Sequence, residues 1–196
     1  MYQKRNELEI LSLFIKGKLT RLYLRQISKM SKLPLKTTQN ALSALEKMHI
    51  LKSTVEGKNK YFSINFDNIQ AKHYILQAEV YKTCALLESY PLKMFAKSLD
   101  VDAPVICFGS FAKFKADKNS DLDLLIVSDK EQKLPYHLLP YKPHPISLSK
   151  EAFGKAIELN EPLIKEVMDN HVILNDHSFY VNLAWNHLRN LYMRSL

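Results

Sequence analysis

The chain has 196 residues, of which 46% are hydrophobic and 24% are charged, and it contains two cysteines. These values are typical of a globular protein with one large or two small domains, and they exclude a disulfide-built scaffold. The formal net charge of +8 is uneven, because residues 1–67 hold 13 of the 28 Lys and Arg but 5 of the 20 Asp and Glu. The first third is therefore expected to have an anionic partner, and nucleic acid is the usual one. A basic surface kept only for solubility is the alternative.

The two cysteines, Cys84 and Cys107, have no Cys or His nearby at the spacing of a metal site. Buried, reduced thiols are expected for both, which fits a reducing cytoplasm. The N-terminus begins an amphipathic pattern, and no apolar run has the length needed to span a membrane. The sequence thus predicts a cytoplasmic protein without a membrane partner.

Residues 1–67 predict three helices followed by a β-hairpin. Apolar residues recur at helical spacing in Glu7–Ile15, Leu22–Leu33 and Leu35–Met48. Two extended stretches then flank Gly57, which supplies the turn. Three helices and a hairpin in a basic segment resemble a winged helix-turn-helix domain.

That resemblance implies DNA as the partner of residues 1–67. The start of the third helix would face the major groove, and the hairpin would meet the phosphate backbone. The residues predicted to bind DNA are Lys36, Thr37, Thr38, Gln39 and Asn40 on the helix, with Lys58 and Lys60 on the hairpin. The alternative is a winged helix used for dimerisation or for docking a partner protein.

The rest of the chain predicts a helical connector over residues 68–100 and an α+β domain over residues 101–196. Pro91 is expected to break the connector helix. Strands are predicted for Val105–Phe108, Leu122–Val127, Ile146–Leu148 and Val172–Leu174, and helices for Phe153–Leu159, Leu163–Met168 and Phe179–Met193. The fold class is therefore α+β, with a small mixed sheet in the second domain.

The informative stretch, FGSFAKFKADKNSDLDLLIV, begins at Phe108. An apolar strand ends at Gly109-Ser110, and a helix is predicted to begin there with Ser110 as its N-cap. Backbone N–H groups at a helix start bind phosphate, and Gly109 lets the phosphate approach the backbone. Gly109 and Ser110 are therefore candidate nucleotide-binding residues.

Asp121 and Asp123 open the next strand. Side chains two apart on a strand share a face, so both carboxylates point the same way while Leu122 and Leu124 point to the other. Neighbouring carboxylates repel each other unless a cation lies between them. Mg²⁺ takes carboxylate and phosphate oxygens, so the pair predicts a Mg²⁺ site beside the phosphate.

This stretch resembles the polymerase-β-type minimal nucleotidyltransferases. Their signature is an apolar residue, Gly-Ser, a spacer of about ten residues, and two acids flanking one apolar residue. Phe108, Gly109, Ser110, Asp121 and Asp123 match that signature. The resemblance implies transfer of NMP from an NTP to an acceptor hydroxyl. It assigns Asp121 and Asp123 as catalytic metal ligands, with two Mg²⁺ ions as one option.

The chain departs from this family at two places. Phe114 stands where many relatives have Gly, and the strand around residues 142–148 lacks the usual third acid. His144 lies near the expected place of that acid, where a neutral imidazole could accept a proton; a surface or structural His is the alternative. Lys113 could neutralise triphosphate charge, and a solvated lysine is its alternative.

Two functions are consistent with these observations. The first is an enzyme that transfers NMP and is guided by its winged helix. The second is a non-catalytic DNA-binding regulator, antitoxin-like, whose degenerate transferase domain binds a nucleotide or a partner. The missing third acid favours the second function, and retention of the two aspartates favours the first.

Overall fold

The computed structural model describes residues 2–16 and 18–195, which form two compact units. The first unit consists of two segments, the residues up to Tyr81 and those from Leu188 onward, whereas the second spans Lys82–His187. Both boundaries fall inside helices, α4 (Ile69–Leu86) and α9 (His177–Met193). The predicted divisions after residues 67 and 100 differ from these unit boundaries, because a sequence pattern cannot show where one continuous helix changes its packing partners.

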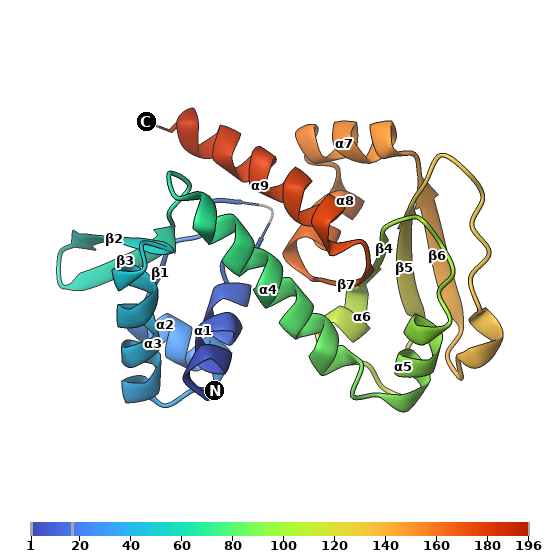
Figure 1. Ribbon diagram of the computed structural model, residues 1–196, viewed down its shortest axis with the longest axis horizontal. Coiled ribbons are helices and arrows are strands. Elements are labelled where there is room, and N and C mark those ends of the chain that lie inside the picture. The colour runs from blue at the N-terminus through green and yellow to red at the C-terminus, as the bar shows by residue number, and fades with distance from the viewer. Residues whose placement is uncertain (1, 17, 196) are drawn as a thin grey trace. The chain divides into compact units, whose positions relative to one another are not determined.

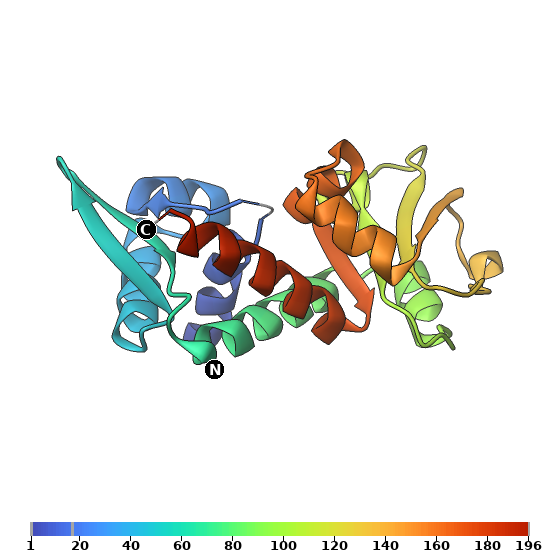
Figure 2. The same ribbon diagram turned by 90° about the horizontal axis from the view of Figure 1, so that it is seen from above.

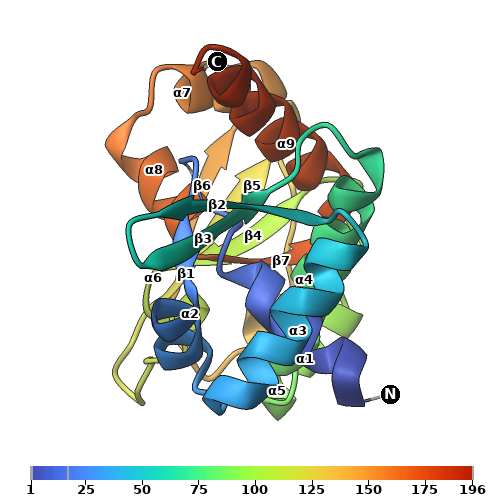
Figure 3. The ribbon, with the colours of Figure 1, turned by 90° about the vertical axis from the view of Figure 1, so that its left-hand side faces the viewer.

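The first unit combines the helices α1, α2 and α3, and parts of α4 and α9, with a small antiparallel sheet (Figure 3). The strand order is β1-β3-β2, and β2 and β3 form the expected hairpin, with Gly57 in its turn. The short strand β1 was not expected and pairs with β3. The elements are α1 (Tyr2–Ser12), β1 (Leu22–Tyr23), α2 (Leu24–Ser31), α3 (Leu35–Lys47), β2 (Leu51–Glu56) and β3 (Asn59–Ile64).

The amphipathic pattern explains why these helices pack together. Ile10, Ile27 and Leu45 are fully buried, one from each helix. Pro34 lies at the N-cap of α3, where its fixed φ suits a helix start and its missing N–H costs no intrahelical bond. The helical periodicity therefore identified the core of this unit.

The second unit is built on a four-stranded mixed sheet with the order β6-β5-β4-β7 (Figures 1 and 2). β4 pairs antiparallel with β5 and β7, whereas β5 and β6 are parallel. The remaining elements are α5 (Tyr90–Lys97), β4 (Val105–Phe108), α6 (Gly109–Ala112), β5 (Leu122–Val127), the 3₁₀ turn η1 (Tyr136–Leu138), β6 (Pro143–Leu148), α7 (Lys150–Glu158), α8 (Pro162–Asp169) and β7 (His171–Asn175).

Both faces of this sheet are covered, which explains why its central strands are almost wholly apolar. Leu122 and Leu124 belong to a core cluster that also contains residues of α5 and α6. Leu125 belongs to a second cluster, with residues of α7, α8 and α9. The expected alternation along β5 is thus confirmed, and Asp123 interrupts an otherwise buried strand.

Three further expectations can be compared with the structure. The connector is broken, as predicted, but α4 already ends at Leu86, and Pro91 lies in the first turn of α5. The prediction of two buried thiols is wrong for Cys84, which is exposed, whereas Cys107 is buried in β4. Within the described residues, no helix has the length and apolar character required to cross a membrane.

Candidate active site

The centre of the candidate site is a close approach between Gly109 and Asp123. Gly109 directly follows β4 and has a left-handed φ of +68°. A Cβ atom at this position would lie 2.2 Å from Oδ2 of Asp123, far inside van der Waals contact. Glycine is therefore required twice, for its backbone conformation and for the space that the carboxylate occupies.

The helix after Gly109 differs from the prediction. α6 already begins at Gly109 and has four residues, so the expected N-cap role of Ser110 is wrong. Phe108 occupies the N-cap position, and no side chain caps the helix. Because one turn aligns few peptide dipoles, the helix macrodipole adds little to phosphate binding here. Ser110 lies half-buried within this turn.

Phe114 follows the end of α6 and has a left-handed backbone conformation. The N–H of Lys115 donates to the Ser110 carbonyl (3.0 Å), and the N–H of Phe114 donates to the Phe111 carbonyl (3.0 Å). This pair of bonds is the Schellman motif, whose left-handed position is usually glycine. Phe114 adopts φ +52° there with its side chain 56% exposed. The chain therefore holds an exposed aromatic ring on a strained backbone.

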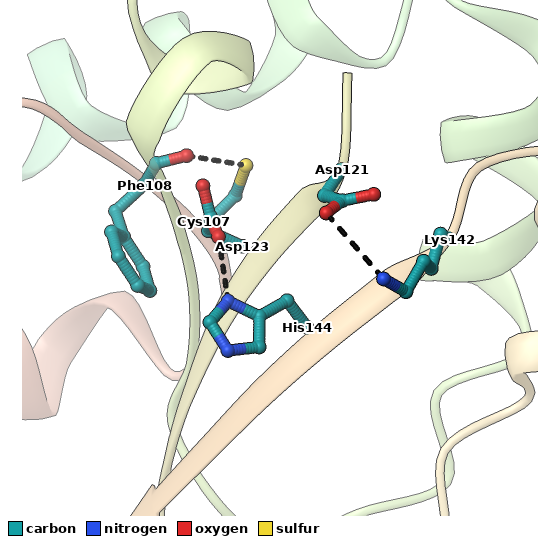
Figure 4. Close-up of polar contacts among 6 residues, drawn as sticks. All are labelled: Cys107, Phe108, Asp121, Asp123, Lys142 and His144. Carbon is teal, nitrogen blue, oxygen red and sulfur yellow. Dashed lines mark hydrogen bonds and ion pairs between the residues drawn. The ribbon is translucent and has the colours of Figure 1, made fainter. Parts of the chain in front are cut away.

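His144 lies beside Asp123 (Figure 4). The two residues are register partners in the parallel β5–β6 pair, and His144 Nδ1 is 3.0 Å from Asp123 Oδ1. The side chains are 63% and 26% exposed, respectively, so solvent reaches the pair. The parallel register thus brings the predicted His144 to one of the two predicted acids.

Asp121 lies just before β5 and faces Lys142, the residue just before β6. Its Oδ2 is 3.9 Å from Nζ of Lys142, which is 80% exposed (Figure 4). An exposed ion pair at this distance contributes little to stability. Sequence reasoning missed Lys142, because only the β5–β6 register reveals that it faces Asp121.

Cys107 lies behind the site as an inert thiol. Burial in β4, and secondarily the negative charge of Asp123, raise the pKa of Cys107 to about 12. The thiol therefore stays protonated at neutral pH. Because nucleophilic attack and metal ligation require the thiolate, Cys107 supplies neither.

The donor set suits a hard divalent cation. Asp121 and Asp123 offer carboxylate oxygens that remain accessible to solvent. Mg²⁺ is commonly held by one or two carboxylates together with substrate phosphates and water. Among the described residues, no group of three His, Cys, Asp or Glu side chains could hold a metal. These two carboxylates therefore fit Mg²⁺ only if phosphate and water complete its coordination.

Lys113 has a partner within the protein. Its ammonium lies 2.9 Å from Oε1 of Glu166 on α8, and both side chains are partly exposed. A bound triphosphate would have to compete with Glu166 for this cation. Sequence reasoning missed Glu166, which is 53 residues away along the chain.

The predicted DNA-binding residues are unequally available in the first unit. Thr38 is fully buried, and its hydroxyl donates to the Pro34 carbonyl (3.1 Å), so it cannot contact DNA. Helical spacing turns this side chain toward the core. Lys36, Gln39 and Asn40 are exposed on α3, and Thr37 is half-buried.

The two hairpin lysines also differ. Lys60 pairs with Glu46 (2.7 Å), whereas Lys58 is exposed and makes no ion pair within the described residues. Glu46 accepts hydrogen bonds from Lys60 and Ser53. Burial alone would raise the pKa of Glu46, but these hydrogen bonds and the Lys60 charge lower it overall. Lys58 is therefore the hairpin cation that is freer to meet an anionic partner.

The second unit contains all of the motif residues, and a family comparison matches the segment that holds them. Residues 92–180 match the family model for the nucleotidyltransferase domain. This segment contains the four-stranded sheet, Gly109, Asp121, Asp123 and His144. The first unit lies outside the match. No curated protein and no solved structure matches the chain.

Proposed function

We propose that the second unit is a Mg²⁺-dependent nucleotidyltransferase that transfers NMP from an NTP to an acceptor hydroxyl. The observation that supports this most strongly is the approach of the Asp123 carboxylate to Gly109, within a segment that matches the nucleotidyltransferase domain. A phosphate at the Gly109 turn would lie next to the acid expected to hold the metal.

The reaction requires one bond to form and one to break. The acceptor oxygen attacks the α-phosphorus, the bond to the pyrophosphate leaving group breaks, and the hydroxyl proton must go to a base. Asp121 and Asp123 would hold Mg²⁺, which when bound offsets negative charge on the phosphates. The Gly109-Ser110 backbone would hold the phosphate chain close to these acids.

His144 is the proposed base in place of the missing third acid. If its Nδ1–H donates to Asp123 Oδ1, Nε2 carries the lone pair and can accept the hydroxyl proton. Asp123 then orients the ring through one oxygen and keeps the other for the metal, as in carboxylate–histidine pairs around metals. The 3.0 Å contact supports this division of roles.

For the first unit, we propose a winged helix that binds DNA. Support comes from three helices followed by a hairpin, from the excess of Lys and Arg in residues 1–67, and from exposed polar residues at the start of α3. Lys36, Gln39 and Asn40 are the proposed contacts on α3, and Lys58 is the proposed phosphate contact on the hairpin.

A non-catalytic regulator is the second candidate function, and one observation favours it. Both acids already face basic residues, Asp121 facing Lys142 just before β6 and Asp123 facing His144 on β6. In a degenerate site, such basic residues would stabilise the carboxylates without a metal. The unit would then bind a nucleotide or a partner protein without turnover.

A labelling experiment distinguishes the two functions. The protein is incubated with α-labelled NTPs, Mg²⁺ and cell extract, in parallel with an Asp121→Asn/Asp123→Asn variant and a Glu151→Gln control. Glu151 is an exposed acid of α7 that pairs with Lys155, outside the site. We expect labelling by the wild type and the control but not by the double variant. Labelling by all three proteins, or by none, would contradict the proposed catalytic function.

The DNA proposal is tested by anisotropy with labelled duplex DNA at several salt concentrations. Affinity should fall as salt rises, because binding releases counterions from the phosphates. Lys36→Gln should weaken binding, whereas Lys93→Gln, at an exposed cation of α5 in the second unit, should not. Absence of binding at low salt would contradict the assignment.

A further inference from the structure

The first unit contains a cavity that the proposed functions do not use. Its volume is about 390 Å³, within the usual range of small-molecule sites. It is bounded by Phe14 and residues 18–21, by the face of the hairpin that carries Lys52 and Thr54, and by the last turns of α9 beside that hairpin (Figure 2). These segments are far apart in the sequence, so the cavity is a product of tertiary folding.

One part of the cavity is apolar and aromatic. Phe14, Phe66 and Leu188 line it and are almost completely buried. Tyr192 stacks on Phe66, with ring centroids 5.7 Å apart and an interplanar angle of 28°. Its hydroxyl donates to Asp67 (3.4 Å), which helps to orient the ring. These side chains present a surface suited to a flat apolar molecule.

The polar part of the lining carries more cations than anions. Lys18, Arg21 and Lys52 line the cavity, and Glu56 is its one acidic residue. Arg21 pairs with Glu56 and also donates to the Thr54 hydroxyl (3.0 Å), so the charge of Glu56 is already matched.

Two lysines remain available to an anion. Lys52 Nζ lies 3.8 Å from the centroid of the Tyr192 ring, and Lys18 is exposed. Neither pairs with a carboxylate within the described part of the chain. Positive charge that is not part of an ion pair therefore lies next to the aromatic wall.

We propose that this cavity binds a small organic anion with a flat apolar body. The carboxylate or sulfonate group would lie between Lys18 and Lys52, and the body would pack against Tyr192 and Phe66. Charge complementarity selects the anion, and the aromatic lining selects the body. The site does not depend on nucleotidyl transfer, because every residue involved belongs to the first unit.

The test uses two fluorescent probes of similar shape on the full chain. 8-Anilinonaphthalene-1-sulfonate carries a negative charge, and N-phenyl-1-naphthylamine is its neutral counterpart. We expect the anionic probe to bind at least about fivefold more tightly, since only it meets the lysines. In ¹⁵N-labelled protein, its amide shifts should concentrate on residues 18–21, 52–56 and 63–66.

Variants connect the binding to the charge. Lys52→Gln should lower the affinity for the anionic probe about fivefold. Lys58→Gln, on the same hairpin but outside the cavity, should leave that affinity unchanged. Lys18→Gln, in an exposed segment, provides the same test if Lys52→Gln does not fold. The proposal is overturned by no binding, by equal affinity for the two probes, by shifts scattered over both units, or by unchanged binding in folded lysine variants.

Discussion

Two turns of the molecule depend on a left-handed glycine, but for different reasons. Gly57, in the hairpin of the first unit, has φ +58°, and a Cβ added there would meet nothing within 4 Å. Gly109, in the second unit, has φ +68°, and a Cβ would meet the Asp123 carboxylate at 2.2 Å. Gly57 is needed only for backbone conformation, whereas Gly109 is needed also for the approach of an acid. The difference distinguishes a structural turn from a turn built around a candidate active site.

The largest expected effect comes from adding a Cβ at each position. Gly57→Ala should cost about 1 kcal/mol, the usual strain of a left-handed alanine. Gly109→Ala should cost about 2–3 kcal/mol, because the Asp123 side chain must also move away from His144. Thermal and denaturant unfolding of the two variants measures the difference.

A double variant isolates the contribution of Asp123. Asp123→Ala removes the two closest atoms and leaves its own Cβ at an ordinary 3.5 Å. In that background, Gly109→Ala should cost no more than Gly57→Ala does in the wild type. An undiminished cost would mean that the carboxylate is not what excludes a side chain at Gly109.

The thiol before the Gly109 turn provides a second contrast. Because burial raises the pKa of Cys107 to about 12, its thiolate is scarce at pH 8. Iodoacetamide should therefore alkylate exposed Cys84 about a hundredfold faster than Cys107, as peptide mass spectrometry would show. In Asp123→Asn, alkylation of Cys107 should stay slow, because burial is the larger cause of its raised pKa. Comparable rates in the folded protein would show that β4 opens readily.

Phe114 tests a third left-handed position. Phe114→Gly should stabilise the protein by about 0.5–1 kcal/mol, since glycine removes the left-handed strain at this Schellman position. Phe114→Ala is the matched control, because it removes the ring but retains the strain, and it should not stabilise. Denaturant midpoints measure both variants. Equal stabilisation by the two would point to the exposed ring rather than the backbone.

The smallest expected effect concerns the lysines that follow Gly57. Lys58→Ala should reduce the salt dependence of DNA binding by about one counterion unit, because Lys58 is unpaired among the described residues. Lys60→Ala should change it less, since Lys60 already pairs with Glu46. Anisotropy titrations at several salt concentrations give both slopes. A larger effect from Lys60 would reverse the proposed roles of the two lysines.

Much of the fold could be predicted from local patterns. The helices of the first unit follow apolar periodicity, Pro91 indicates a break in the connector and lies in the first turn of α5, and the alternation in β5 places Leu122 and Leu124 in the core. The start of α6 could not be predicted, because Ser110 suits an N-cap but the chain already turns at Gly109. The prediction that Thr38 binds DNA was wrong for a related reason. A threonine at the start of the helix suggested a contact with a base, whereas its position on the helix turns its side chain toward the core.

For the candidate site, the sequence alone determined which residues are proposed to carry the chemistry, because Gly109, Asp121 and Asp123 have a characteristic type and spacing. Only the tertiary structure decided what they face. The parallel register of β5 and β6 brings His144 to Asp123 and Lys142 to Asp121, and residues from three distant segments enclose the cavity of the first unit. Spacing along a chain determines local conformation, but the pairing of strands determines which side chains from distant segments meet.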